Sequence, residues 1–177
     1  MTYLITFCCY GSHVPGEPGA VHRHDNHVGS PAMPENSALA AAVRRTLSNP
    51  PYQLDPEQRA VVLKAIVQVC SHRAWTLLAA HVRSTHVHVL AQADCSPEHA
   101  MNAFKSYASH ELNKYGGAQT KRWARHGSTV YLWKPDAVTK AVRYVIEEQG
   151  EPMAVYAGEH PRYSSEPAVS PPSPSGY

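Results

Sequence analysis

Apolar and polar residues alternate along several short stretches of the chain, and apolar residues recur at helical spacing along others. Alternation over four to eight residues is typical of strands, whereas apolar residues every three or four positions are typical of helices. The pattern predicts strands at 2–10, 74–83, 85–93, 129–133 and 153–157, and helices at 36–48, 54–73, 97–115 and 135–149. The two central strands are separated by one or two residues, which is the spacing of a hairpin.

The helix at 54–73 has clear end signals. Asp55 can cap it, Pro56 suits the first helical position, and Gln58 completes a capping box. The next helix starts in the same way, with a serine followed by a proline, and a Tyr-Gly-Gly stretch ends it. These two helices are therefore the most sharply bounded elements that the sequence predicts.

In chain order the elements run β-α-β-β-α-β, and a third helix follows. This is the ferredoxin-like or split βαβ plan, in which helices pack on an antiparallel sheet. The sequence therefore predicts an α+β domain over 1–157 with a long loop at 11–53, and a Pro- and Ser-rich disordered tail at 158–177. The second face of the sheet is available for a ligand or a further helix.

Charge is unevenly distributed along the chain. The formal net charge is only +2, but 101–145 holds eight basic and two acidic residues, which is +6 locally. Such asymmetry is a hint of a polyanionic partner, although a solvated basic surface explains it equally well. The four cysteines form no C-x-x-C pair, so no disulfide framework is expected. No signal peptide or membrane-length apolar run is visible.

Two histidines lie one residue apart in the strand predicted at 85–93. His86 and His88 share one face with Leu90, because alternate residues of a strand point the same way. Neutral imidazole is a common metal ligand, and an open site needs a third protein ligand. The alternative to a metal site is a strand whose two histidines are solvated or hydrogen-bonded and bind no metal. The N-terminal loop holds four more histidines, whose spacing favours a polar loop over a zinc site: His13, His22, His24 and His27.

The stretch THVHVL, which belongs to the hairpin, resembles the His-hydrophobic-His motif of the HUH endonuclease superfamily. Four more stretches resemble single-tyrosine transposases of the small insertion-sequence type, including REP-associated tyrosine transposases: YLITFCCYGSHVPGEPGAVHRHDNHVGSP, NAFKSYAS, KRWARHGSTVYLW and AVRYVIEEQGEPMAVY. The similarity covers most of 2–156 in consistent order. It places the HUH motif on a central strand.

This resemblance implies a metal-dependent transposase that uses Mg²⁺ or Mn²⁺ as its cofactor. Such an enzyme cleaves and rejoins single-stranded DNA at hairpin-bearing ends through a 5′-phosphotyrosine intermediate. The resemblance also implies a homodimer, in which the tyrosine helix can serve the partner's histidines. With no membrane segment expected, the predicted location is the cytoplasm, at the nucleoid when the protein is bound to DNA.

The resemblance implies a catalytic tyrosine on a late helix, and Tyr144 is the candidate. On a helical wheel it falls away from the side that Val142 and Val145 share, which favours a nucleophile over a core tyrosine. The family often carries an amide residue four positions after the tyrosine as a third metal ligand. Here Glu148 has that position and Gln149 has that residue type. Residues four apart share a helical face, so Glu148 is favoured and Gln149 stays a candidate.

The candidate DNA contacts come from the basic stretch: Lys105, Arg122, Trp123, Arg125 and His126. Arginine pairs with phosphate and tryptophan stacks on unpaired bases, but Trp123 is equally suited to anchor a core. The main alternative function is a domesticated protein that binds a DNA hairpin without cleaving it. A replication or plasmid-transfer initiator and a plain metal-binding protein are more distant alternatives.

Overall fold

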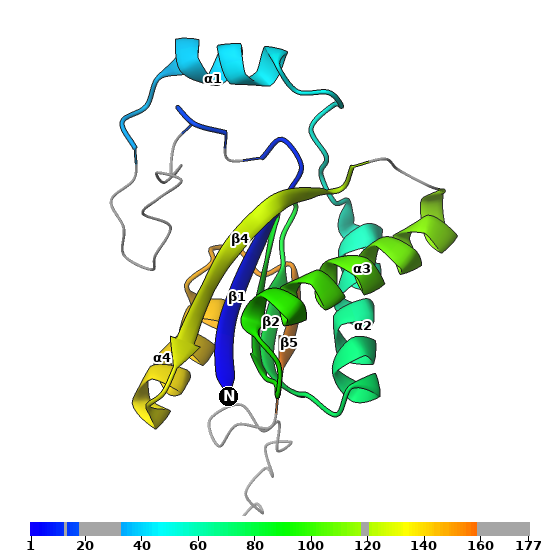
Figure 1. The fold of residues 1–177 in the computed structure, drawn as a ribbon, viewed down its shortest axis with the longest axis vertical. Coiled ribbons are helices and arrows are strands. Elements are labelled where there is room, and N and C mark those ends of the chain that lie inside the picture. The colour runs from blue at the N-terminus through cyan, green and yellow to red at the C-terminus, as the bar shows by residue number, and fades with distance from the viewer. Residues whose placement is uncertain (13, 18–32, 118–120, 159–177) are drawn as a thin grey trace, which may run out of the picture.

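The computed structural model describes residues 1–12, 14–17, 33–117 and 121–158, and it contains a five-stranded sheet with helices on both faces (Figure 1). The elements in chain order are β1 (Thr2–Cys9), α1 (Ser37–Arg45), α2 (Pro56–His72), β2 (Thr76–Val82), β3 (His86–Gln92), α3 (Pro97–Gly116), β4 (Trp123–Leu132), α4 (Pro135–Glu147) and β5 (Ala154–Ala157). The strand order is β4-β1-β3-β2-β5, and all neighbouring strands are antiparallel. The first four strands have the ferredoxin-like order, which confirms the predicted α+β plan.

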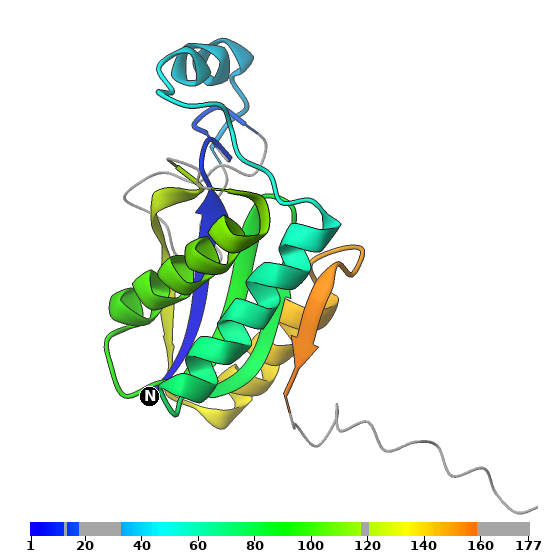
Figure 2. The same ribbon diagram turned by 90° about the vertical axis from the view of Figure 1, so that its right-hand side faces the viewer.

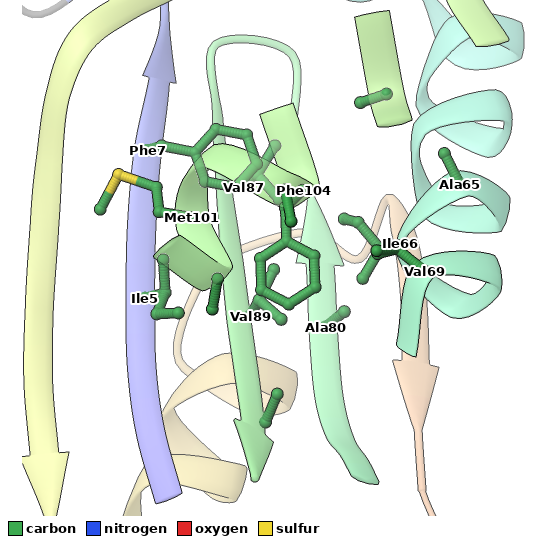
Figure 3. Close-up of a cluster of buried hydrophobic side chains, with 14 of the residues drawn as sticks. Ile5, Phe7, Ala65, Ile66, Val69, Ala80, Val87, Val89, Met101 and Phe104 are labelled. Atoms are coloured by element: carbon green, nitrogen blue, oxygen red, sulfur yellow. The ribbon is translucent and has the colours of Figure 1, made fainter. Parts of the chain in front are cut away.

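The sheet separates two apolar clusters. Helices α2 and α3 cover one face, and α4 lies against the other (Figure 2). Strand β3 is central and contributes to both clusters, because Val87 and Val89 face α2 and α3 whereas Leu90 faces α4. Figure 3 shows Phe104 of α3 and Ile66 of α2 pointing toward these valines. The α4 side of β3, where the two histidines also lie, is therefore the less apolar of its two faces.

The helix ends follow the local sequence. Asp55 caps α2, and its reciprocal capping box with Gln58 is present as predicted. The Ser96 side chain accepts a hydrogen bond from the backbone N–H of His99 at the start of α3. These caps satisfy N–H groups that the first turn of a helix leaves without partners. The short helix predicted near 36–48 is also present as α1.

Strand β4 is longer than the sequence predicts. Most of 121–128, predicted as a basic loop, belongs to the strand, which starts at Trp123 and pairs with β1. Gly127 is the reason that the prediction is wrong. A Cβ there would collide with the backbone oxygen of Thr6 and lie 2.8 Å from the sulfur of Met101. The glycine therefore permits a close approach of two strands rather than a turn.

Two predictions lie outside the described residues: the N-terminal histidines (His13, His22, His24 and His27) and the tail from 159 onward. The domain limits of 1–157 stay a prediction. All four cysteines are described, and none forms a disulfide. Within the described parts of the chain, no helix has the length and apolar character needed to cross a membrane.

Candidate active site

The histidine pair lies on the face of β3 that α4 covers. His86 and His88 are adjacent on this face, and their ring centroids are 5.0 Å apart. His88 is buried at 5% exposure, whereas His86 is half-buried at the start of the strand. The pair therefore has one imidazole inside the protein and one within reach of a ligand from solvent.

His88 has one partner and one unpaired atom. Thr6 lies opposite it on β1, and the Oγ1 atom of Thr6 is 2.8 Å from Nδ1 of the ring. Burial, with a smaller contribution from the neighbouring imidazoles of His86 and His81, lowers the pKa of His88 to about 3. The ring is therefore neutral at physiological pH. Its Nε2 atom is buried and has no hydrogen-bond partner of ordinary geometry among the described residues.

Tyr144 lies beside this ring. Its aromatic ring meets His88 edge-on, with the centroids 5.6 Å apart and the planes at 80°. The side chain is half-buried against the cluster that contains Val142 and Val145. Tyr144 thus lies at the border of the sheet-facing side of α4, and not on the far side as the helical wheel predicts. The difference arises because Ala141, next to Tyr144 on the wheel, is buried as well.

The position at which α4 ends determines whether Glu148 or Gln149 lies near Tyr144 and His88. The helix ends at Glu147, so the rule that residues four apart share a face does not extend to Glu148. Glu148 is half-exposed and pairs with Arg143 at 3.3 Å. Gln149 turns back, and its Nε2 donates to the backbone oxygen of Tyr144 at 3.0 Å.

Gln149 also acts on the buried histidine. An interaction with its side chain raises the pKa of His88, against the larger lowering that burial causes. The structure therefore brings Gln149 to the histidines and leaves Glu148 outside, opposite to the preference from sequence position. No cluster of three His, Cys, Asp or Glu side chains arranged for a metal occurs in the described parts of the chain. A metal held here would take an amide oxygen as its third protein ligand.

The donor set fits a divalent cation. The set consists of a neutral imidazole whose buried Nε2 has no hydrogen-bond partner among the described residues, a second imidazole beside it, and a side-chain amide that interacts with the first ring. Imidazole nitrogen suits transition ions, and amide oxygen suits Mg²⁺ and Mn²⁺. His86, His88 and Gln149 are thus the residues of this chain that could hold such an ion, with open positions for substrate oxygens.

A third histidine, which the sequence does not single out, supports the site from β2. His81 lies opposite His88 in the sheet and is fully buried. Its Nδ1 is 3.0 Å from the backbone oxygen of Val145 on α4, and its Nε2 accepts from the backbone N–H of Met153 at 3.2 Å. Because Nε2 is an acceptor, Nδ1 carries the proton. His81 therefore ties both ends of the turn after α4 to the sheet.

Three of the predicted DNA contacts are used inside the protein. Lys105 is buried, and its Nζ donates to the backbone oxygens of residues 124, 125 and 126 on β4. Arg122 is buried and donates to Asn113 and to the backbone oxygen of residue 117. The indole of Trp123 donates to α3 and packs edge-on against Phe7. These side chains hold β4 and α3 together and are not arranged to meet a phosphate.

The other basic groups differ in their exposure. Arg125 and His126 are exposed on β4, an edge strand, as a DNA-contacting residue would be. Arg83, which the sequence does not single out, follows β2 and donates to the backbone oxygen of Glu151 at 3.1 Å. Its charge also lowers the pKa of His88. Arg83 is thus a cation close to the histidines.

Comparison with known proteins gives one family. Residues 52–144, which are 93 of the 177 residues, match the family described as "Transposase IS200 like". No curated protein matches the chain. A solved structure of a REP-associated tyrosine transposase bound to a REP hairpin matches with 13% identity and a TM-score of 0.47. That match covers 82% of this chain and 64% of the other, so this chain spans less than two thirds of that protein's length.

Proposed function

Because this chain belongs to the IS200-like transposase family, we propose that it cleaves and rejoins single-stranded DNA through a 5′-phosphotyrosine intermediate on Tyr144. The observation that carries the proposal is the contact of Tyr144 with His88, whose buried Nε2 has no hydrogen-bond partner in the part of the chain that the structure describes. The proposal is supported by the contact of the Tyr144 and His88 rings, the adjacent His86 ring, and the Gln149 side chain, which bonds to the Tyr144 backbone and interacts with His88. His86, at the start of β3, is only half-buried, which is compatible with access of a substrate from solvent.

The proposed reaction exchanges one phosphoester bond for another. The Tyr144 oxygen attacks the phosphorus, and the bond from phosphorus to the 3′ oxygen breaks. The leaving 3′ oxygen gains a proton while the tyrosine hydroxyl loses one, so the step is balanced in charge and atoms. Attack by a 3′-hydroxyl on the phosphotyrosine reverses the step and rejoins the strand. The bond energy is conserved throughout, so no nucleotide cofactor is needed.

A divalent metal, Mg²⁺ or Mn²⁺, would stabilise the charge that develops on the phosphate and orient it toward the tyrosine. His86, His88 and Gln149 would hold this ion, on the evidence of the donor set described above. Arg83 adds a fixed positive charge beside the histidines. Arg125 and His126 on the exposed edge of β4 are the basic residues proposed to contact the flanking DNA hairpin.

The arrangement supports a nucleophile that works with the histidines of its own chain. Tyr144 already packs against His88 of the same molecule, and His81 fixes the carbonyl of the next residue on α4. A homodimer remains part of the proposal, but the site does not require a partner's tyrosine. Mixing His88→Asn with Tyr144→Phe tests this point. Action in cis predicts that the mixture stays inactive, and restored cleavage would show that the tyrosine serves the partner.

Trapping of the covalent intermediate tests the nucleophile. A single-stranded oligonucleotide with a hairpin, incubated with the protein and Mn²⁺, should give an adduct that survives denaturing electrophoresis. The adduct should be lost in Tyr144→Phe and retained in Tyr131→Phe, a matched change at an exposed tyrosine on β4. An adduct that persists in Tyr144→Phe would refute the assignment.

The main alternative is a hairpin-binding protein that no longer cleaves, and the five-residue spacing between Tyr144 and Gln149 is the sequence feature that favours it. The turn after α4 supports cleavage over this alternative, because it returns Gln149 to the backbone of Tyr144. The trapping experiment separates the two functions. Tight hairpin binding that EDTA does not change, with no adduct under any metal, would favour the alternative.

A further inference from the structure

Each of the two histidines has a threonine hydroxyl at Nδ1. Thr6 Oγ1 lies 2.8 Å from Nδ1 of His88, and Thr85 Oγ1 lies 3.1 Å from Nδ1 of His86. The two contacts arise differently. Thr85 is the sequence neighbour of His86 at the hairpin turn, whereas Thr6 is placed by the β1–β3 register, 82 residues away in the chain. The contact between Thr6 and His88 therefore forms only when the sheet is assembled.

Metal binding would fix the proton of the His88 ring. If Nε2 donates its lone pair to a cation, the neutral imidazole must carry its proton on Nδ1. That N–H group lies inside the protein, since His88 is only 5% exposed. A buried donor without an acceptor is costly, so the metal-bound form needs an acceptor at Nδ1. Thr6 Oγ1 is the atom at hydrogen-bond distance.

The ring orientation depends on the same contact. Nδ1 is held by β1, so Nε2 points away from β1, and Tyr144 and Gln149 both interact with this ring. Rotation of the ring by half a turn would break the contact with Thr6 and remove Nε2 from the site. A hydroxyl on the neighbouring strand thus selects both the tautomer and the direction of the metal-binding atom.

We infer that Thr6 is a positioning residue for the metal site: its hydroxyl accepts the Nδ1 proton of His88 and aims Nε2 at the bound cation. This inference rests on the proposed function only for the presence of a metal. Partners of this kind typically change metal affinity by roughly 10- to 100-fold when they are removed. The effect at Thr6 should exceed that at Thr85, because water can replace a hydroxyl beside the more exposed His86.

Metal affinity gives the most direct test. Isothermal titration with Mn²⁺ on the DNA-free protein should show binding that is roughly 10- to 100-fold weaker in Thr6→Val. Thr6→Ser keeps the hydroxyl and should restore affinity. Thr2→Val is a matched control on the same strand and face, about 13 Å away at the rise of a strand, and should bind as the wild type does. Unchanged affinity in Thr6→Val, or equal losses in Thr6→Val and Thr6→Ser, would overturn the inference.

A second measurement needs no variant at Thr6. Two-bond ¹H–¹⁵N spectra of the Mg²⁺-loaded wild-type protein should show the His88 proton on Nδ1, and a proton on Nε2 would refute the inference even if Thr6→Val fails to fold. The test also separates this inference from the proposed function. If His88→Asn leaves Mn²⁺ affinity unchanged, the metal site itself fails and the inference fails with it. If His88→Asn weakens binding and Thr6→Val does not, only the role of Thr6 is lost.

Discussion

The burial of His88 as a neutral ring makes the stability of the metal-free protein sensitive to acid. Burial lowers its pKa to about 3 in the folded protein, while an imidazole in an unfolded chain titrates near 6.5. As the pH falls below about 6.5, the unfolded chain takes up a proton that the folded protein does not. Stability is therefore retained above this pH and is lost progressively as the pH falls toward about 3.

The size of the effect follows from the two pKa values. At pH 5 the unfolded imidazole is almost fully protonated and the folded one is almost fully neutral. Linkage then gives a loss of about 2 kcal/mol between pH 7.5 and pH 5 from His88 alone. His81, whose pKa burial also lowers, adds a loss of the same sign. Against the total stability expected for a domain of this size, about 5–15 kcal/mol, such a loss is readily measured.

Urea unfolding at pH 7.5 and pH 5, with EDTA present, measures this loss. Other groups titrate in the same range, so the comparison is with His88→Asn, whose amide can keep the contact with Thr6 and does not titrate. The wild type should lose about 2 kcal/mol more than the variant over this interval. If the two proteins lose equal amounts, His88 is not held neutral in the folded state and the description of its environment is wrong.

Three further changes test the surrounding structure. Gly127→Ala should lower the free energy of unfolding by about 1–3 kcal/mol, because the new methyl group meets the β1 backbone; Gly116→Ala, with open space around it, should change urea stability little. His81→Leu leaves a buried carbonyl and a buried N–H without partners, so unfolding should become easier by about 2–5 kcal/mol, and cleavage should fall because α4 is released. Lys105→Met should destabilise the protein, but the folded fraction should keep its DNA affinity. Arg125→Ala should instead weaken DNA binding and reduce the salt dependence of the binding constant by about one charge. Equal effects of the two variants on DNA affinity would contradict the positions assigned to these side chains.

The parts of the fold that local signals define could be predicted from the sequence. The capping box at Asp55, the serine-proline start of α3 and the alternation across the hairpin all depend on neighbours in the chain. Strand β4 could not be predicted in full, because Gly127 resembles a turn glycine locally. Gly127 is needed because its backbone lies very close to β1, and this close approach exists only once the sheet has formed.

In the candidate site, too, features set by neighbouring residues could be predicted, whereas features set by contacts between distant strands could not. The shared face of His86 and His88 follows from the period of a strand, and the structure has it. Thr6 and His81 carry no local signal, since their partners lie on other strands and depend on register. The position of Lys105 also depends on contacts that are distant in the chain. A lysine in a basic stretch suggests a phosphate contact, but this one is buried against the carbonyls of β4.

The end of α4 explains why the residue beside the histidines is an amide and not a carboxylate. Gln149 donates its Nε2 hydrogen to the backbone oxygen of Tyr144, and the same side chain interacts with His88. A carboxylate at that position has no hydrogen to donate to the carbonyl and would face it with like partial charge. The same contact couples two parts of the proposed chemistry. Because one side chain interacts with both Tyr144 and His88, a movement of the helix that carries Tyr144 also moves the third candidate ligand, so the proposed nucleophile and the proposed metal site should form or separate together.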